Sequence, residues 1–180
     1  VPLPGRHMLS NVLCAALGAG LAGAPAEGIA EAIVAFEGVP HRLEHVTDRE
    51  GVRFVNDSQA TIPIAAIAAL EAFDAPVVLI AGGKDKGLDY AAFADAVAEQ
   101  CRAAVLIGET ADELAALIGA RVRVERAADM ESAVRAAADL ARRGDVVLLS
   151  PAAASFDMFV DYAARGDAFR AAVTSLTGDR

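Results

Sequence analysis

Three polar loops carry the residues of this sequence that could bind a small anion. Residues 82–87 read Gly-Gly-Lys-Asp-Lys-Gly, residues 150–156 read Ser-Pro-Ala-Ala-Ala-Ser-Phe, and residues 56–61 read Asn-Asp-Ser-Gln-Ala-Thr. Glycine lets the backbone approach an anion, lysine supplies a point charge, and hydroxyl groups donate hydrogen bonds. Each loop follows a hydrophobic run, which is where open α/β sheets bind ligands. The loops therefore predict a site for a carboxylate or a phosphate.

Plain structural interpretations of the same loops stay open. Residues 82–87 could form an ordinary surface turn, and residues 150–156 could simply connect a strand to a helix. The phosphate-binding pattern GxxxxGK[ST] is absent from the whole chain, and so is the GxSxG pattern of serine hydrolases. The histidines lack metal-ligand spacing, and nothing pairs the loop aspartates as acid and base. We therefore expect no catalytic residue and no metal site in this chain.

Hydrophobic runs alternating with helical patterns must position these loops. Such alternation predicts an α/β fold with a Rossmann-like, mostly parallel sheet and helices on both faces. Residues 43–46 and 52–55, separated by a charged turn, indicate a β-hairpin at its start. The other predicted strands are residues 77–80, 104–107, 122–124 and 146–149, with helices starting near residues 63, 89, 110 and 129 and a last one over 167–176. The three polar loops should then meet at the carboxyl edge of the sheet.

Capping residues mark where some of these helices should begin. Thr61 is a candidate cap for the helix that contains Pro63, because proline is tolerated in a first helical turn. Thr110 and Glu113 have the spacing of a capping box. Asp129 should cap the helix that follows it.

The first 38 residues have a different character from the rest. Residues 8–21 predict a buried helix, and Pro25 opens a second one, which Gly38-Val39-Pro40 ends at a linker or domain boundary. The order of charged, apolar and small residues near the N-terminus also resembles a signal peptide. Glycines and Asn11 interrupt that apolar stretch, and the chain begins with Val1-Pro-Leu-Pro rather than with methionine, so we interpret it as starting within a longer protein.

Composition limits the classes of function. The chain has 180 residues and a formal net charge of −9, so its field repels nucleic acid and anionic membranes. Cys14 and Cys101 have no CxxC partner, and we expect both to be buried free thiols in a reducing cytoplasm.

Five stretches in register resemble the Mur ligases, most closely the members that add D-glutamate to UDP-N-acetylmuramoyl-L-alanine. The resemblance covers essentially the whole chain. The stretches are residues 5–11, 38–44, 56–61, 82–87 and 150–157.

The resemblance implies the C-terminal portion of a three-domain cytoplasmic ligase of peptidoglycan synthesis. Such a ligase uses ATP and Mg²⁺ to make an acyl phosphate, which the amine of D-glutamate then attacks. Residues 1–38 would be the last helices of the central ATPase domain, and residues 39–180 the C-terminal Rossmann-like domain. We expect the parent to be a monomer and the present chain to be inactive alone, with no ATP or Mg²⁺ bound to it.

The family's binding residues transfer by motif onto eight positions. Thr61, Lys86, Ser155, Phe156 and Tyr162 would hold D-glutamate. Asn11 would contact adenine, Arg42 the ATP phosphates and Asp57 the ribose. Three positions depart from the family pattern, namely Met8 in place of Asn, Gln59 in place of Lys and Ala153 in place of Cys.

Three other interpretations of the sequence remain open. One is a different Mur or folylpolyglutamate-type ligase, and a second is a stand-alone, non-catalytic module that binds small anions. The third is a purely structural α/β domain.

Overall fold

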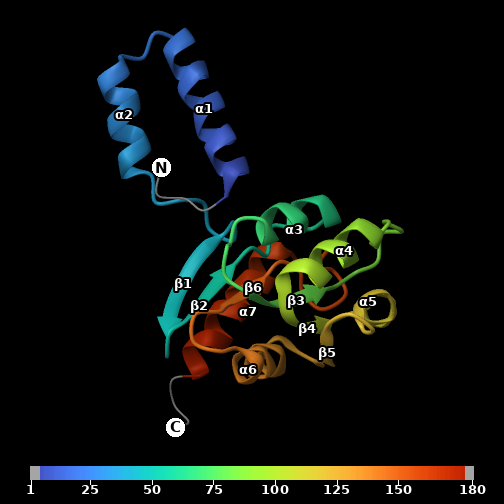
Figure 1. Ribbon diagram of the computed structural model, residues 1–180. Coiled ribbons are helices and arrows are strands. Elements are labelled where there is room, and N and C mark those ends of the chain that lie inside the picture. Colours follow the sequence, from blue (N-terminus) through green and yellow to red (C-terminus); the bar gives the residue numbers. More distant parts are fainter. Residues whose placement is uncertain (1–4, 177–180) are drawn as a thin grey trace.

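A single six-stranded sheet forms the centre of the computed structural model, which describes residues 5–176 (Figure 1). The strand order is β1-β2-β6-β3-β4-β5, with β1 and β2 antiparallel and every other neighbouring pair parallel. The strands are β1 (Glu44–Arg49), β2 (Val52–Asn56), β3 (Val77–Gly82), β4 (Cys101–Ile107), β5 (Arg123–Arg126) and β6 (Val146–Leu149). The predicted α/β fold with its opening β-hairpin is confirmed.

Helices cover both faces of this sheet and bury it. Alternate side chains of a strand point to opposite faces, so β3 contributes Leu79 to one core and Ile80 to the other. Residues of α3, α4 and α5 complete the first core, and residues of α6 and α7 complete the second. These helices are α3 (Pro63–Leu70), α4 (Ala91–Gln100), α5 (Ala111–Ile118), α6 (Met130–Leu140) and α7 (Tyr162–Ser175).

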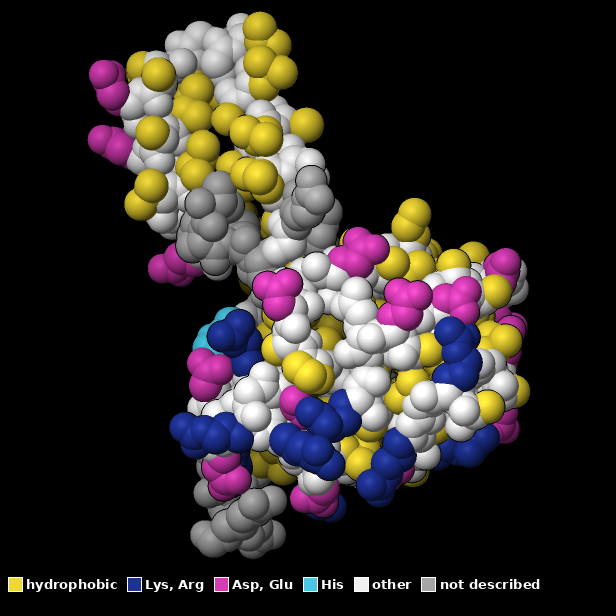
Figure 2. Space-filling model, viewed as in Figure 1, with side chains coloured by type: hydrophobic (Ala, Val, Ile, Leu, Met, Phe, Trp, Pro, Cys, Tyr) yellow, Lys and Arg dark blue, Asp and Glu magenta, His cyan; other side chains and the backbone are white. Residues whose placement is uncertain are grey.

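Two further helices, α1 (Arg6–Leu21) and α2 (Ala26–Ala35), form a hairpin that projects away from the sheet (Figure 1). The prediction of a buried helix over residues 8–21 is wrong. Leucines at every fourth position of α1 are between 47% and 81% exposed, namely Leu9, Leu13, Leu17 and Leu21. Residues four apart lie on one helix face, so the leucines form a continuous apolar stripe, and Figure 2 shows mainly hydrophobic and uncharged atoms on this hairpin.

Two predicted side-chain caps do not form, although Thr110 is the N-cap residue of α5 as predicted. Ile62 is the N-cap of α3, and no side chain caps that helix. Thr110 does precede α5, but its hydroxyl accepts a hydrogen bond from the backbone of Gly83 instead of capping the helix. Asp129 does cap α6, where Ser132 completes a capping box.

The last helix begins five residues earlier than predicted, at Tyr162, because Asp161 caps it by accepting a bond from the backbone N–H of Ala164.

The cysteine prediction fails for Cys14, which is exposed on α1, whereas Cys101 is half-buried. No helix within residues 5–176 has the length and hydrophobicity needed to cross a membrane. The first four residues of predicted domain 1–38 and the last four of domain 39–180 lie outside the described residues.

Candidate functional site

The three polar loops leave the sheet side by side at one edge. They follow β2, β6 and β3, which are parallel neighbours in that order, so their carboxyl ends coincide. Backbone hydrogen bonds join the loops. The N–H of Ala152 donates to the carbonyl oxygen of Ala60 at 3.0 Å, and the N–H of Lys84 donates to the carbonyl oxygen of Ala154 at 2.9 Å. The predicted meeting of these loops at one edge is confirmed.

The residues expected to hold D-glutamate all lie on this edge, and their surroundings differ. Ser155 is only 2% exposed, and within residues 5–176 its hydroxyl has no hydrogen-bond partner. Thr61 is half-buried, and Lys86 is exposed. Phe156 directly follows Ser155 and is 71% exposed; Tyr162 is 39% exposed, and its ring packs edge-to-face against His41 with 6.1 Å between ring centroids. The arrangement offers a cation and two hydroxyl groups beside aromatic surface, which suits a small carboxylate.

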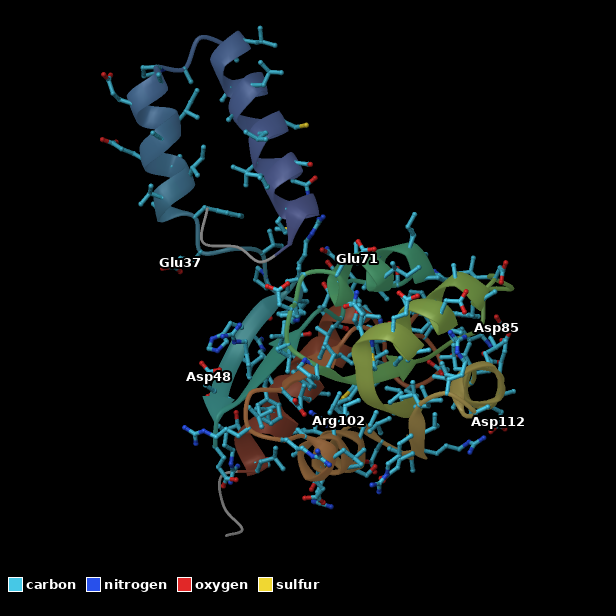
Figure 3. The ribbon with its side chains drawn as sticks, viewed as in Figure 1. Glu37, Asp48, Glu71, Asp85, Arg102 and Asp112 are labelled. Atoms are coloured by element: carbon cyan, nitrogen blue, oxygen red, sulfur yellow. The ribbon has the colours of Figure 1, made fainter. Side chains whose placement is uncertain are left out.

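The two lysines in the loop after β3 differ in their ion pairing. The Nζ of Lys84 lies 2.7 Å from the carboxylate of Glu109. A hydrogen bond with Glu109 raises the pKa of Lys84, and the same bond lowers the pKa of Glu109. Lys86 has no ion pair among the residues that the structure describes. Asp85, which lies between the two lysines, is labelled in Figure 3 and marks this loop near α4 and α5. Lys86 is therefore the loop cation left to meet a ligand.

The residues expected to contact ATP divide between two places. Asn11 and Arg42 line one pocket of about 630 Å³, which lies mainly between α1 and α2. Its other lining side chains are almost all apolar, as the flat face of a purine requires. One amide and one guanidinium at an apolar slot fit a base and a phosphate chain. Asn11 and Arg42 thus share one apolar pocket, and their contacts with adenine and phosphate stay predictions.

Asp57 does not line that pocket and lies inside the domain, although its charge interacts with that of Arg42. It is 5% exposed, and its two carboxylate oxygens accept bonds from the backbone N–H of Leu43 at 3.1 Å and from the hydroxyl of Ser150 at 2.8 Å. Burial raises the pKa of Asp57 to about 6, although both bonds oppose that rise. Asp57 links β2, β6 and the segment before β1, and a ribose would have to reach its remaining lone pairs.

The described residues do not supply a magnesium site. No group of three or more His, Cys, Asp and Glu within residues 5–176 is placed to hold a metal ion.

Three positions that depart from the family pattern have distinct environments. Met8 is 4% exposed and lines the pocket that also contains Asn11. Gln59 is half-buried, and its backbone N–H donates to the carbonyl of His41. Ala153 is completely buried, so a larger side chain would have to displace its neighbours.

The sequence interpretation missed Arg165 and Gly166, which pack directly behind this edge. Arg165 is 1% exposed, and a Cβ on Gly166 would lie 2.2 Å from the Nδ1 of His41. The Nδ1 of His41 also lies 3.0 Å from the side-chain nitrogen of Asn56. The predicted helix over 167–176 begins after Gly166, so the sequence pattern carried no signal there; only α7 as observed places this glycine inside a helix, where it is unfavourable by about 1 kcal/mol relative to alanine and needs a packing reason.

Comparison with known proteins identifies relatives of this arrangement. A family model described as "Mur ligase, glutamate ligase domain" matches residues 41–153. A protein of Solibacter usitatus named UDP-N-acetylmuramoylalanine--D-glutamate ligase is 47% identical over 176 residues, covering 98% of this chain and 40% of that protein. A protein of the same name from Aromatoleum aromaticum is 48% identical over 179 residues, covering 98% and 38% respectively. The chain thus spans about two fifths of the length of these curated relatives.

Solved structures share the fold at lower sequence identity. A UDP-N-acetylmuramate-alanine ligase of Thermotoga maritima superposes with a TM-score of 0.72 at 16% identity, covering 97% of this chain and 39% of that one. A folylpolyglutamate synthase of Mycobacterium tuberculosis gives 0.69 at 20% identity, covering 100% and 42%. Both matches include α1 and α2, so the projecting hairpin belongs to the shared architecture.

Proposed function

The chain belongs to the Mur ligase family, with its glutamate ligase domain, and from this premise we propose that it is the C-terminal part of an ATP-dependent ligase. The parent ligase joins D-glutamate to the L-alanine carboxylate of UDP-N-acetylmuramoyl-L-alanine in peptidoglycan synthesis. ATP activates that carboxylate as an acyl phosphate, and the amine of D-glutamate attacks it. The reaction takes place in the cytoplasm.

One observation carries the choice of D-glutamate. The loops after β2, β3 and β6, which together offer a free ammonium group and a hydroxyl without a partner among residues 5–176, meet at one edge of the sheet. D-glutamate has two carboxylates, and charge-assisted hydrogen bonds to them are stronger than neutral ones. Relatives that are 47% and 48% identical bear D-glutamate in their names. The folylpolyglutamate synthase is only 20% identical, so its likeness concerns the fold alone.

The proposal assigns a role to each side chain at this edge. Lys86 provides a positive charge for one carboxylate, and Thr61 and Ser155 donate hydrogen bonds to the carboxylates. Phe156 and Tyr162 border the aliphatic part of the amino acid. On the hairpin side, Asn11 and Arg42 serve adenine and the phosphates, and Asp57 serves the ribose.

We further propose that the projecting hairpin belongs to a neighbouring domain of the parent. The leucine stripe on α1, exposed at Leu9, Leu13, Leu17 and Leu21, is apolar surface that a stable protein covers. Residues 1–38 would then be the end of the ATPase domain, and residues 39–180 the acceptor-binding domain.

This division of the parent predicts that the present chain does not catalyse ligation. Ligation requires ATP and the acceptor amino acid to be held against one another by two domains. The chain alone should neither hydrolyse ATP nor form the amide bond. It should bind D-glutamate with a Kd near 1 mM, since few preformed partners give a small ligand only about 4 kcal/mol.

The decisive experiment compares acceptors in the purified full-length parent. Release of ADP is measured with ATP, Mg²⁺ and UDP-N-acetylmuramoyl-L-alanine, and with D-glutamate, L-glutamate, L-lysine or L-alanine as acceptor. The proposal expects ADP release with D-glutamate and little with the other three. Efficient ADP release with another amino acid, and none with D-glutamate, would refute it.

A further inference from the structure

The guanidinium of Arg165 is buried with no carboxylate of the described residues within ion-pair distance, although the more distant carboxylate of Asp157 also acts on its charge. It belongs to the largest side chain that is fully buried, at 1% exposure, and no ion pair of Arg165 occurs within residues 5–176. An arginine in the first turns of an exposed helix could instead extend into water at little cost. Burial of a charge that lacks a close ion-pair partner is unfavourable, so hydrogen bonds must help to hold this side chain inside the protein.

Such hydrogen bonds join Arg165 to two of the site loops. From the loop after β2, the hydroxyl of Ser58 accepts from Nε at 3.0 Å, and its carbonyl accepts from Nη2 at 2.9 Å. From the loop after β6, the carbonyls of Ala153 and Ala154 accept from Nη1 at 3.0 and 3.1 Å. The planar guanidinium group of Arg165 therefore fixes the distance between the segments that lead to Thr61 and Ser155.

The third loop and the start of α7 pack on the same group. A Cβ on Gly83 would lie 3.1 Å from the Nη1 of Arg165 and 2.1 Å from the carbonyl oxygen of Ala154. The hydroxyl of Ser58 donates to the carbonyl of Tyr162 at 2.7 Å. Arg165 thus contacts or orders every segment that carries a residue expected to bind D-glutamate.

We infer that Arg165 is a positioning residue that sets the relative placement of the three acceptor-site loops. The ligand assigned to these loops rests on the proposed function, whereas the geometry does not. Arginine is required because its donors lie in a plane and point in several fixed directions. A lysine would keep the charge, but its single nitrogen cannot serve Ser58 and the two alanine carbonyls together.

The test compares Arg165→Lys with wild type in the full-length parent, by steady-state kinetics in which D-glutamate and ATP are varied separately. The KM for D-glutamate should rise by about tenfold or more, since small misplacements of binding groups have large effects, while the KM for ATP changes less than about twofold. Arg135→Lys, on the exposed face of α6, serves as the matched control and should change neither. An Arg165→Lys enzyme with both KM values unchanged would overturn the inference.

Two further measurements separate positioning from simple loss of folded protein. Added guanidinium ion should lower the raised D-glutamate KM of Arg165→Ala and leave wild type unaffected; absence of this rescue counts against the inference. Ser58→Ala removes the Nε acceptor with a smaller change in volume. Its effect on the D-glutamate KM should not add to that of Arg165→Lys, because both variants break the same contact. Fully additive effects would contradict the inference even if Arg165→Ala did not fold.

A failure of the proposed function would be recognised separately. If the wild-type parent does not use D-glutamate, nuclear magnetic resonance of the present chain decides the positioning role. Arg165→Lys should then shift the backbone amide signals of Gly83, Ala154 and Ser155, and Arg135→Lys should not. Unchanged signals at all three positions would overturn the inference independently of the ligand.

Discussion

Single residues at the sheet edge combine burial with polarity, and Asp57 is the clearest case. Its carboxylate is 5% exposed and is held by hydrogen bonds from Leu43 and Ser150. Burial disfavours the charged form and raises the pKa of Asp57 from 3.8 to about 6. The charged carboxylate therefore lowers the stability of the folded chain at neutral pH.

This cost predicts a defined pH dependence for Asp57→Asn. Between about pH 4 and pH 6 the folded chain binds the proton of Asp57 more tightly than the unfolded chain, so its stabilising contribution is lost as the pH rises. The free energy of unfolding of wild type should fall relative to that of Asp57→Asn by on the order of 2–3 kcal/mol across this window. Urea unfolding at several pH values measures the difference. The exposed Asp74→Asn serves as the control for removing one carboxylate, and parallel curves for Asp57→Asn and wild type would contradict the expectation.

Among the helices and strands, those with continuous hydrophobic runs were predictable from sequence. The predicted strand over residues 77–80 lies within β3, and the predicted strand over residues 146–149 coincides with β6. Every residue of both strands is buried. Because polar loops follow β2, β3 and β6, the sequence also predicted which residues share an edge. The caps of α3 and α5 were not predictable in this way, since the hydroxyl of Thr110 bonds to Gly83, which is 27 residues away.

Arg165 escaped prediction for a related physical reason. Its position in α7 is buried only because the loops after β2 and β6 close over it, with Ser58 lying 107 residues away in sequence. Local patterns contain no information on such contacts. The leucines of α1 show the opposite error, since their pattern indicates burial but the sheet does not reach them.

The contact between α7 and the segment before β1 predicts the effect of Gly166→Ala. Alanine is normally favoured over glycine inside a helix by about 1 kcal/mol. At this position a Cβ would lie 2.2 Å from the Nδ1 of His41 and 3.0 Å from the Nδ2 of Asn56, so the substitution should destabilise the chain by about 1–3 kcal/mol. Thermal unfolding measures the change. Gly18→Ala in α1, where a Cβ meets nothing within 4 Å, should not destabilise, and equal effects of the two variants would refute this explanation.

At the scale of the whole molecule, the chain consists of a packed sheet domain and a helical hairpin with much exposed apolar surface (Figure 2). The helices α1 and α2 contact each other, and the exposed leucines of α1 lack the covering that the sheet has on both faces. Amide hydrogens in regions with few buried apolar contacts exchange through local opening.

Hydrogen exchange of the isolated chain should therefore distinguish the two parts. The amides of α1 and α2 should exchange much faster than those of β3, whose side chains are completely buried. Mass spectrometry of peptides from both regions provides the comparison, with α6 as an internal reference for a helix packed on the sheet. Equal protection of the hairpin and β3 would indicate that residues 5–176 behave as one self-contained unit.

Lys86 must face the acceptor amino acid rather than ATP if the proposed function of the whole molecule is correct. Among the described residues Lys86 is the free cation of its loop, whereas Lys84 is paired with Glu109. Removing a charged group that binds a carboxylate weakens the binding free energy by about 1.5–3 kcal/mol. The matched control is Lys84→Ala, which removes a lysine from the same loop but breaks only a surface ion pair.

Steady-state kinetics of the full-length parent, with D-glutamate and ATP varied separately, tests this claim most directly. For Lys86→Ala we predict that the KM for D-glutamate rises by about ten- to a hundredfold, that the KM for ATP changes by less than about threefold, and that Lys84→Ala has a much smaller effect than Lys86→Ala. A Lys86→Ala enzyme whose KM for D-glutamate and kcat both equal those of wild type would contradict the assignment of the acceptor site to this edge of the sheet.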